Sequence, residues 1–248
     1  MSRDPFFLRG EVPFLRAYRQ TETPAEEGRK IRALFARIAP RYDLANRVLS
    51  LSVDRLWRWR VVRKLSPASG HRVLDLFCGT GDLTRALGAS GAEVTGADFC
   101  PEMLLLAKER SPGLQYIAAD ALCLPFPDGH FDLVTAAFGV RNLVDIDRGL
   151  KEMIRVTRGG GRIGILEFSH PRAAWIRVLY RFYLRHWLPR IGGWITGDRS
   201  SYTFLSRTIP AFLDQEGLAA RMRVCGLEAV RYHNFTGGIA ALHVGRKH

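Results

Sequence analysis

A glycine-containing loop flanked by acidic residues is the segment of this sequence best suited to bind a reactive ligand. It spans residues 75–82 (DLFCGTGD) and follows a short apolar run. The glycines at 79 and 81 let the chain turn sharply and let a ligand lie against the backbone. A dinucleotide site would place a third glycine at position 84 to receive a pyrophosphate, but that residue is Thr84, and Asp75 and Asp82 would repel phosphate. The loop instead suits a ligand with an ammonium and a sulfonium group, which favours S-adenosylmethionine over NAD.

Two further acids follow the next two apolar runs. Asp98 ends the second run, where a carboxylate can accept hydrogen bonds from both ribose hydroxyls. Asp120 follows the third run, within reach of an adenine amino group. Each acid alone would be more typical of a helix cap or an exposed loop. Together with Asp75, Gly79 and Gly81, however, they predict a nucleoside cofactor site at the ends of three consecutive strands.

The elements that position these residues alternate between strands and helices. Short apolar runs predict strands over residues 72–77, 93–98, 114–118, 131–138 and 162–168, and helical spacing predicts helices over 82–87, 101–110 and 146–156. Three glycines at 159–161 predict a turn into the fifth strand. The alternation indicates an α/β fold, with a mostly parallel sheet and helices on both faces. A helix over 212–225 and an antiparallel hairpin over 230–244, turning at 236–238, complete the expected sheet.

The remaining segments lie on either side of this sheet. Residues 1–28, with three prolines, predict an irregular and poorly ordered arm, and helices follow from Arg29 to Pro40 and over 54–65. In residues 172–191 three arginines recur every four residues, at 177, 181 and 185, opposite a broad aromatic and aliphatic arc. We expect this helix to end at Pro189. It suits an anionic membrane surface, or equally a cover over the acceptor pocket with its arginines in water.

The composition narrows the class of protein. The chain has 248 residues, 47% of them hydrophobic, which excludes wholesale disorder. Its net charge of +13 comes from the two ends, residues 1–70 and 171–248. Four cysteines without a CxxC pair favour reduced thiols in the cytoplasm over disulfides or a zinc site. No run approaches the roughly 20 apolar residues that a spanning helix needs.

Six stretches of the chain carry a resemblance to a known family. Residues from about 30 to 247 resemble the ubiquinone/menaquinone-biosynthesis C-methyltransferases, within the class I S-adenosylmethionine-dependent methyltransferases. The matching stretches are RYDL (41–44), LD with GTGD (74–75 and 79–82), LPFPD (124–128), FGVRN (138–142), LEFS (166–169) and NFTGG (234–238). The glycine loop occurs in many methyltransferases, whereas FGVRN and NFTGG are much more particular to this family.

The resemblance implies a Rossmann-like class I methyltransferase domain over residues 29–248, with a seven-stranded sheet. Residues 29–66 would form a helical cover, and 172–208 a helical insertion over the acceptor site. The implied reaction is methylation of a ring carbon of a polyprenylated hydroquinone, such as demethylmenaquinol or a benzoquinol. The implied cofactor is S-adenosylmethionine, and no metal is required. Thr80 and Ala121 would join Asp75, Gly79, Gly81, Asp98 and Asp120 in the cofactor site.

Residues for the acceptor are expected at the carboxyl ends of the fourth and fifth strands, where sheets of this kind bind ligands. Arg141 and Asn142 would hold the quinol oxygens, although Arg141 could instead pair with Asp145 or Asp147. Glu167 and His170 would accept the ring proton, or would be a pair that stabilises loops. Two residues of the RYDL stretch, Tyr42 and Asp43, would cover the acceptor or cap their helix.

Two other functions compete with this interpretation. The basic ends suggest an RNA methyltransferase, but no RNA-binding module is recognisable and we expect no nucleic-acid partner. A module that only binds would show a damaged glycine loop, and this loop is intact. We therefore expect a cytoplasmic enzyme, either free or peripheral at the anionic inner face of the membrane.

Overall fold

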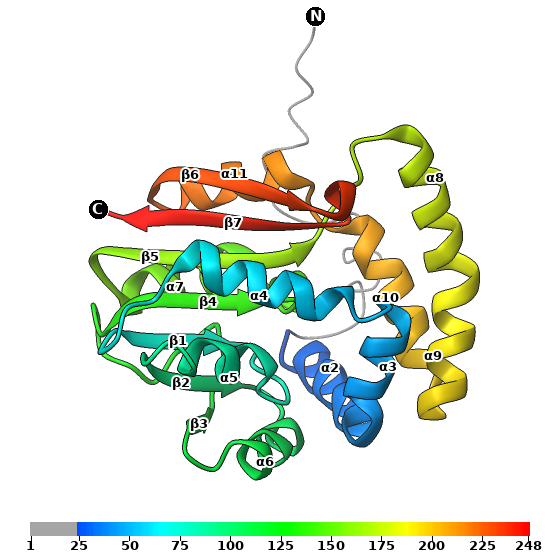
Figure 1. Cartoon of the computed structure of the whole chain (residues 1–248), viewed down its shortest axis with the longest axis horizontal. Helices are drawn as coiled ribbons and strands as arrows, with labels where there is room; N and C mark the ends of the chain where they lie inside the picture. The colour runs from blue at the N-terminus through cyan, green and yellow to red at the C-terminus, as the bar shows by residue number, and fades with distance from the viewer. Residues whose placement is uncertain (1–23) are drawn as a thin grey trace, which may run out of the picture.

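The computed structural model describes residues 24–248 of the chain, so most of the predicted N-terminal arm lies outside the described residues. One seven-stranded sheet forms the centre, in the order β3-β2-β1-β4-β5-β7-β6 (Figure 1). The strands are β1 (Arg72–Leu76), β2 (Glu93–Asp98), β3 (Gln115–Ala118), β4 (Phe131–Ala137), β5 (Thr157–Phe168), β6 (Leu227–Phe235) and β7 (Ala240–Lys247). The first five are parallel, and β7 runs antiparallel between β5 and β6. This confirms the expected fold class and the terminal hairpin.

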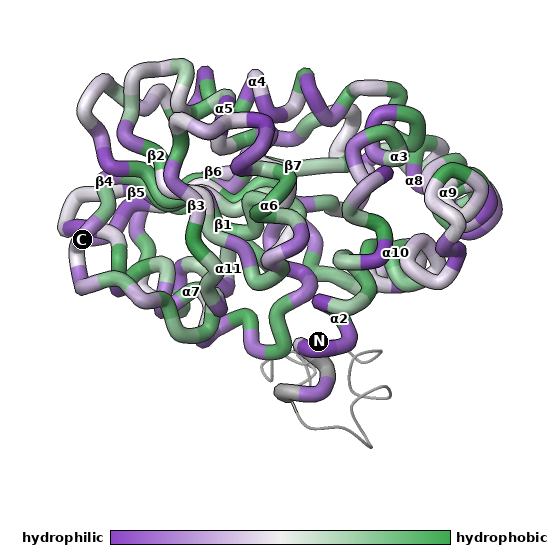
Figure 2. The backbone as a smooth tube through the Cα atoms, turned by 90° about the horizontal axis from the view of Figure 1, so that it is seen from below, coloured by the Kyte–Doolittle hydropathy of each residue, from purple (hydrophilic) through white to green (hydrophobic). Residues whose placement is uncertain are grey.

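Helices cover both faces and the carboxyl edge of the sheet. They are α2 (Pro24–Ile38), α3 (Tyr42–Leu49), α4 (Val53–Leu65), α5 (Asp82–Gly88), α6 (Pro101–Arg110), α7 (Ile146–Val156), α8 (Ala174–Phe182), α9 (Leu188–Thr196), α10 (Arg199–Ala211) and α11 (Gln215–Val224). α4 and α5 pack on one face of the sheet, and α7 and α11 on the other. Figure 2 shows the resulting pattern, with apolar strands inside and mixed colouring along the helices.

Side-chain alternation along the strands explains these two cores. Val73 of β1 packs with Val61 and Leu87 on the α4–α5 face, whereas Leu74 packs with Leu150 and Met222 on the opposite face. Successive residues of a strand point to opposite faces, so a central strand with both faces covered must be apolar almost throughout. Asp75 breaks this rule in β1, and it marks the functional edge.

The three glycines at 159–161 lie within β5 rather than in a turn before it. Phe131 of β4 pairs with Thr157, and Leu133 pairs with Arg162, so the residues between Thr157 and Arg162 bulge out of the ladder. Gly160 has a φ of +71°, and a Cβ at Gly161 would lie 3.0 Å from the Asp132 oxygen. The glycine run therefore serves the bulge, and the expected turn is corrected to an irregular part of the strand.

Two prolines lie in the first turn of a helix, where the sequence predicted the end of a helix or an irregular arm. At Pro189 the chain passes through a π-helical turn, η5 (Tyr183–Trp187), directly into α9, and proline occupies the first turn of that new helix. Likewise α2 begins at Pro24, so residues 24–28 are helical and do not belong to an irregular arm. Proline is tolerated in a first helical turn because the amide hydrogen it lacks has no partner there.

Candidate functional site

A cavity of about 360 Å³ opens at the carboxyl edge of the sheet, between the strand ends and α2. Such a position is where open α/β sheets bind their ligands. The loops after β1, β2, β3 and β4 all contribute to its wall. In this wall, α2 contributes Ile31, Arg32 and Phe35, and α3 contributes Tyr42. The strand ends and the loops after them contribute Leu76, Phe77, Gly79, Ala97, Asp98, Phe99, Ala119, Asp120, Ala121, Phe138, Gly139 and Asn142.

The glycine loop bends because its backbone is left-handed at two positions. Gly79 has a φ of +54° and Gly81 a φ of +83°, and a Cβ at Gly81 would lie 2.6 Å from the Tyr116 hydroxyl. Of the non-glycine residues in the cavity lining, two share this conformation, Phe77 with a φ of 56° and Phe138 with a φ of 57°. They follow β1 and β4, adjacent strands, and both line the cavity. Backbone strain of this kind concentrates at ligand sites.

Asp98 lies in the cavity wall and stabilises the glycine loop. Its Oδ2 accepts a hydrogen bond from the Gly79 amide (2.8 Å), and its Oδ1 accepts one from the Cys100 amide (2.9 Å). Burial raises the pKa of this carboxyl, and the backbone hydrogen bonds oppose that shift. A carboxylate oxygen can accept more than one hydrogen bond, so both oxygens keep capacity for ribose hydroxyls.

Asp75 lies beneath the loop and does not line the cavity. Its side chain is fully buried, and its two oxygens accept hydrogen bonds from Thr84 and Thr135, each at 2.7 Å. Burial raises its pKa to about 6, Asp98 adds to that effect, and Arg58 and the threonine hydroxyls act against it. The threonine that replaces the third glycine thus holds an acid in place. The structure makes Asp75 a support of the loop, not part of its surface.

The remaining cofactor-site residues divide into two groups. Asp120 and Ala121 line the cavity, and Asp120 Oδ1 accepts a hydrogen bond from the Leu122 amide (2.9 Å). Thr80 and Gly81 do not belong to the lining. The Thr80 hydroxyl instead donates to Asp43 Oδ1 (2.7 Å), which links the loop to α3.

The two residues predicted from the RYDL stretch have different surroundings. Tyr42 lines the cavity and packs edge-on against Phe35 of α2, with ring centroids 6.2 Å apart. Asp43 does not line it. Its carboxylate accepts from Thr80 and forms an ion pair with Arg110 of α6. Asp43 therefore fastens the helical cover to the cofactor loop.

Arg141 and Glu167 form a buried ion pair outside the cavity wall. Arg141 Nη1 lies 2.7 Å from Glu167 Oε1, and the two side chains are 4% and 1% exposed. The same guanidinium donates to the Phe138 carbonyl and stacks over the Phe168 ring, 5.3 Å from its centroid. Glu167 also accepts from the Phe168 amide. The pair joins the ends of β4 and β5.

The alternative partners expected for Arg141 are occupied elsewhere. Asp145 accepts from the Arg148 amide as the N-cap of α7, and Asp147 pairs with Arg221 of α11 (2.5 Å). The suggestion that Arg141 pairs with either of them is therefore wrong. Proximity in sequence misled because the true partner, Glu167, lies on the neighbouring strand.

Asn142 and His170, the last two predicted acceptor residues, lie apart. Asn142 lines the cavity, and its buried Oδ1 has no hydrogen-bond partner among residues 24–248, so it can accept from a ligand. His170 contacts the Phe212 carbonyl through Nε2 (3.0 Å) and borders a separate crevice of about 20 Å³ next to Tyr180. The cavity thus unites Tyr42 and Asn142 and leaves out Arg141, Glu167, His170 and Asp43.

Sequence reasoning missed the contribution of α2 to the cavity. Ile31 and Phe35 of this helix line the cavity, whereas the sequence predicted only a helix from Arg29 to Pro40. The available signal was that this helix leads directly into the RYDL stretch. Sequence reasoning also missed Thr135, which donates to Asp75. The only indication of this contact was a hydroxyl in an otherwise apolar strand.

Comparison with known proteins identifies similar chains. The model of the ubiE/COQ5 methyltransferase family matches residues 23–247. A demethylmenaquinone methyltransferase from Thermus thermophilus is 45% identical over 218 residues, which are 86% of this chain and 99% of that protein. One from Deinococcus radiodurans is 44% identical over 228 residues, 90% of this chain and 94% of that protein.

Solved structures share the fold at lower identity. An S-adenosylmethionine-dependent methyltransferase from Thermotoga maritima superposes with a TM-score of 0.64 at 19% identity, covering 87% of this chain and 99% of its own. A phosphoethanolamine N-methyltransferase from Haemonchus contortus, solved with S-adenosyl-L-methionine, has a TM-score of 0.57 at 16% identity. It covers 77% of this chain and 52% of its own. These likenesses confirm the class I methyltransferase fold.

Proposed function

The chain belongs to the ubiE/COQ5 methyltransferase family, and we propose that it methylates a ring carbon of demethylmenaquinol with S-adenosylmethionine. It is an S-adenosylmethionine-dependent C-methyltransferase of menaquinone biosynthesis. The observation that carries the assignment to this site is the intact glycine loop, with Asp98 beside it in a cavity of about 360 Å³. That volume falls within the range of small-molecule sites.

The residues present fit S-adenosylmethionine. We assign Asp98 to the ribose hydroxyls and Asp120 to the adenine amino group, with Gly79 and Ala121 along the nucleoside. Gly81 and Thr80 shape the loop from behind, and Asp75 adds negative charge beneath it. When bound, this cofactor supplies a methyl group on a cationic sulfur, and nearby carboxylates favour a cation over a phosphate.

The acceptor half is proposed to hold the quinol between Tyr42 and Asn142. The unpaired Asn142 Oδ1 accepts from a quinol hydroxyl, and the rings of Tyr42 and Phe138 confine the aromatic plane. A quinol is an electron-rich carbon nucleophile, so alignment of the ring carbon is the main task of the protein. Arg141 and Glu167 act as positioning residues, because their ion pair fixes the turn that carries Asn142.

The proton lost from the ring carbon needs an acceptor. Among residues 24–248 the cavity lining contains neither Glu167 nor His170, which were the two predicted bases. We therefore assign this step to water at the cavity mouth, since loss of the proton restores aromaticity and is strongly downhill. The cover formed by α2 and α3 limits how much water enters.

The reaction is tested directly with purified protein, S-adenosylmethionine and chemically reduced demethylmenaquinone in detergent. Mass spectrometry should show one methyl group gained on the naphthoquinol ring. A demethylated benzoquinol in a parallel reaction measures whether the ubiquinone-type step is also catalysed. Absence of methylation of both quinols, with cofactor binding intact, would contradict the substrate assignment. Methylation of RNA under the same conditions would replace it.

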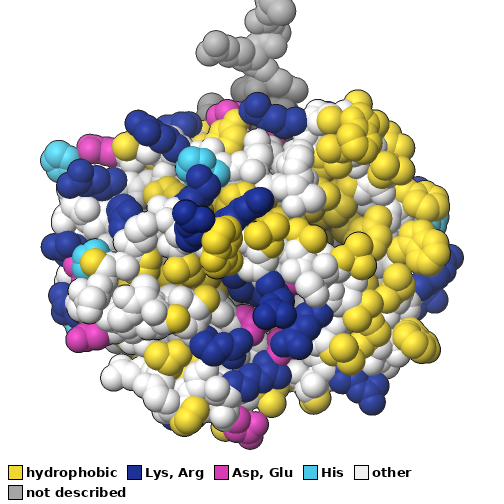
Figure 3. Space-filling view, viewed as in Figure 1, with side chains coloured by type: hydrophobic (Ala, Val, Ile, Leu, Met, Phe, Trp, Pro, Cys, Tyr) yellow, Lys and Arg dark blue, Asp and Glu magenta, His cyan; other side chains and the backbone are white. Residues whose placement is uncertain are grey.

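We propose in addition that the protein works at an anionic membrane surface. In residues 24–248 no helix is long and apolar enough to cross a bilayer. However, α8 and α9 expose large apolar side chains, with Trp175 68% and Trp194 86% exposed. Figure 3 shows the apolar side chains gathered over the side where Figure 1 places α8 and α9. We call this the outer face, made of Trp175, Val178, Leu179, Phe182, Trp187 and Trp194.

Charge on the outer face supports this partner. Arg181 and Arg185 are exposed on the same helical segment as Trp175 and Trp187, and a segment with basic and amphipathic aromatic side chains suits anionic lipid headgroups. Arg177, by contrast, donates to the Pro171 and Arg172 carbonyls and secures the start of α8. The expected stripe of three arginines is therefore reduced to two that are available for lipid.

Flotation with vesicles tests this association. Vesicles with anionic lipid should carry the chain upward at low salt, and the double variant Arg181→Glu/Arg185→Glu should lose most of that binding. The matched control is Arg72→Glu/Arg246→Glu, with the same charge change at the opposite edge of the sheet. Equal flotation of all three proteins would contradict the proposal. Concentration-dependent dimers that hide the tryptophans from quencher would assign the face to a second copy instead.

A further inference from the structure

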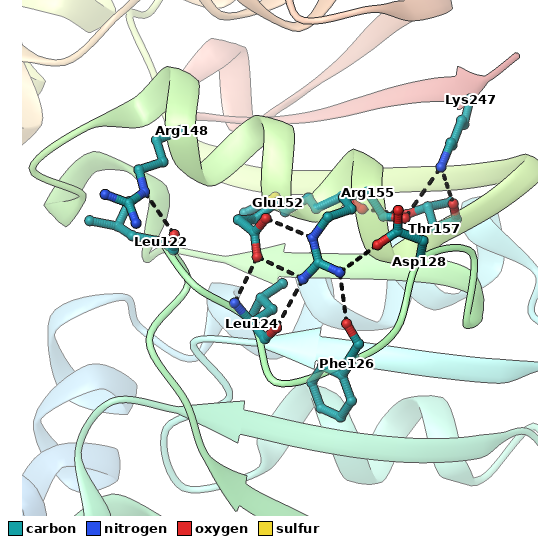
Figure 4. Close-up of polar contacts among 10 residues, drawn as sticks. Leu122, Leu124, Phe126, Asp128, Arg148, Glu152, Arg155, Thr157 and Lys247 are labelled. Atoms are coloured by element: carbon teal, nitrogen blue, oxygen red, sulfur yellow. Dashed lines mark hydrogen bonds and ion pairs between the residues drawn. The ribbon is translucent and has the colours of Figure 1, made fainter.

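Three charged side chains of α7 hold the loop between β3 and β4 (Figure 4). We call Arg148, Glu152 and Arg155 the loop clamp. Glu152 Oε2 accepts a hydrogen bond from the Leu124 amide (2.8 Å), and Arg155 Nη2 donates to the Leu124 carbonyl (2.9 Å). Arg155 Nη1 donates to the Phe126 carbonyl (2.8 Å). The side chains of the clamp thus supply hydrogen bonds to backbone groups of the loop, which belongs to no helix or strand that would pair them.

The clamp is itself rigid. Arg155 Nε and Nη2 donate to the two oxygens of Glu152, at 2.7 and 2.8 Å, in a two-pronged pair. Such forked ion pairs fix geometry as well as charge. The hydrogen bonds from Arg155 lower the pKa of Glu152, and a further bond joins Arg155 to Asp128 (2.8 Å). The loop is therefore held along its length by one side of α7.

The beginning of the same loop lines the cofactor cavity. Asp120, Ala121 and Leu122 all belong to its wall. The Leu122 amide donates to Asp120 Oδ1 (2.9 Å), while the Leu122 carbonyl accepts from Arg148 Nε (2.9 Å). A single residue thus connects the clamp to the carboxylate of Asp120. Within the described residues, Asp120 Oδ2 has no hydrogen bond and is available to a ligand.

We propose that the loop clamp positions Asp120 and thereby sets the preference of the cofactor site for a base with an exocyclic amino group. The inference rests on the proposed function, in which Asp120 accepts from the adenine amino group. A fixed carboxylate accepts from an amino hydrogen but repels the carbonyl oxygen that hypoxanthine presents at the same place. A loosened loop would let the carboxylate turn into water, and the two bases would then bind alike.

Calorimetric titration with two ligands tests this inference. S-adenosylhomocysteine and S-inosylhomocysteine differ only in the base, and the unaltered chain should prefer the adenosyl form by about tenfold or more. In Arg155→Ala and in Arg148→Ala that preference should fall at least fivefold, mainly through weaker binding of the adenosyl form. In turnover, KM for S-adenosylmethionine should rise more than kcat falls. Arg155→Lys, which keeps charge without the fork, should lie between.

Arg158→Ala is the matched control. Arg158 lies three residues beyond Arg155 and pairs with Asp132 (2.6 Å), away from the loop, so its removal should keep the preference. If Arg155→Ala does not fold, Arg148→Ala carries the test, because it removes one contact to the Leu122 carbonyl. An unchanged preference in folded arginine variants would overturn the inference.

Asp120→Ala separates this inference from the proposed function. Loss of the preference in Asp120→Ala but not in the arginine variants would refute only the role of the clamp. If Asp120→Ala keeps the preference, the assignment of Asp120 to the base fails, and the role of the clamp fails with it. Methylation of the quinol is read separately and would still test the reaction.

Discussion

In the cofactor half of the site, at the ends of β1, β2 and β3, acidic side chains are held by backbone amides and hydroxyls. Asp98 is bound by the Gly79 and Cys100 amides, and Asp75 by two threonines. In the acceptor half, at the ends of β4 and β5, Arg141 and Glu167 are held by each other. One half presents negative charge to a ligand, and the other neutralises its charges internally.

This difference follows from the ligands that each half is proposed to receive. A cationic cofactor gains from carboxylates whose charge is not cancelled by a cation, so neutral donors are the suitable supports. A quinol is neutral and apolar, and a free charge next to its ring would lose hydration without a partner. Pairing Arg141 with Glu167 gives a firm turn around Asn142 without that cost. Substitutions in either half test this difference in charge.

The largest effect is expected from Arg141→Ala. It leaves Glu167 buried without its cation, which should lower the free energy of unfolding by about 3–5 kcal/mol. Turnover should fall more than tenfold, while the affinity for S-adenosylhomocysteine stays nearly unchanged because the cofactor half is intact. Urea unfolding, kinetics and calorimetry measure the three quantities.

A double variant separates folding from function in this half. Arg141→Met/Glu167→Leu removes both charges and should recover most of the lost stability. If Arg141 positions Asn142, turnover should stay low in the recovered protein. Near-normal turnover in either variant would remove the ion pair from the mechanism.

The next effect belongs to the cofactor half. Asp98→Ala removes two backbone contacts of the loop and the proposed ribose contacts, and hydrogen bonds to a charged group contribute about 1.5–3 kcal/mol each. Affinity for S-adenosylhomocysteine should fall roughly a hundredfold, corresponding to about 3 kcal/mol. Asp98→Asn, which keeps one acceptor oxygen, should lose less. A loss below threefold in Asp98→Ala would mean that the nucleoside binds elsewhere.

The two halves also differ in how far the sequence revealed them. The loop is contiguous, so its position at the carboxyl edge of the sheet, together with Asp98 and Asp120, could be predicted from spacing. Spacing did not show that Asp75, Thr80 and Gly81 lie outside the cavity lining. Arg141 lies in the turn after β4 and Glu167 on β5, and Thr135 reaches Asp75 across a strand pair. Contacts of this kind depend on sheet register, which a single sequence does not encode locally.

The helices and strands were likewise predictable where the signal is local in the sequence. The bounds of β2, α6 and α7 agree with the predicted ranges, because caps, prolines and apolar periods are local signals. The bulge before Arg162 and the continuation of the helix past Pro189 were missed. In both cases a local residue type was interpreted without the neighbouring strand or turn that accommodates it.

The smallest effect comes from the buried acid beneath the loop and tests whether its charge is uncompensated. Burial raises the pKa of Asp75 to about 6, so the folded state favours its protonated form. That contribution to stability is complete at acid pH and is lost as pH rises through about 6. The free energy of unfolding of the unaltered chain, relative to Asp75→Asn, should therefore fall by about 1 kcal/mol between pH 5 and 7.

Glu93→Gln, on the exposed start of β2, is the control and should keep the pH dependence of the unaltered chain. A difference between the unaltered chain and Asp75→Asn that stays constant from pH 5 to 7 would mean that the threonine hydroxyls offset the cost of burying this carboxylate as fully as Arg141 does for Glu167, and the contrast between the two halves would disappear.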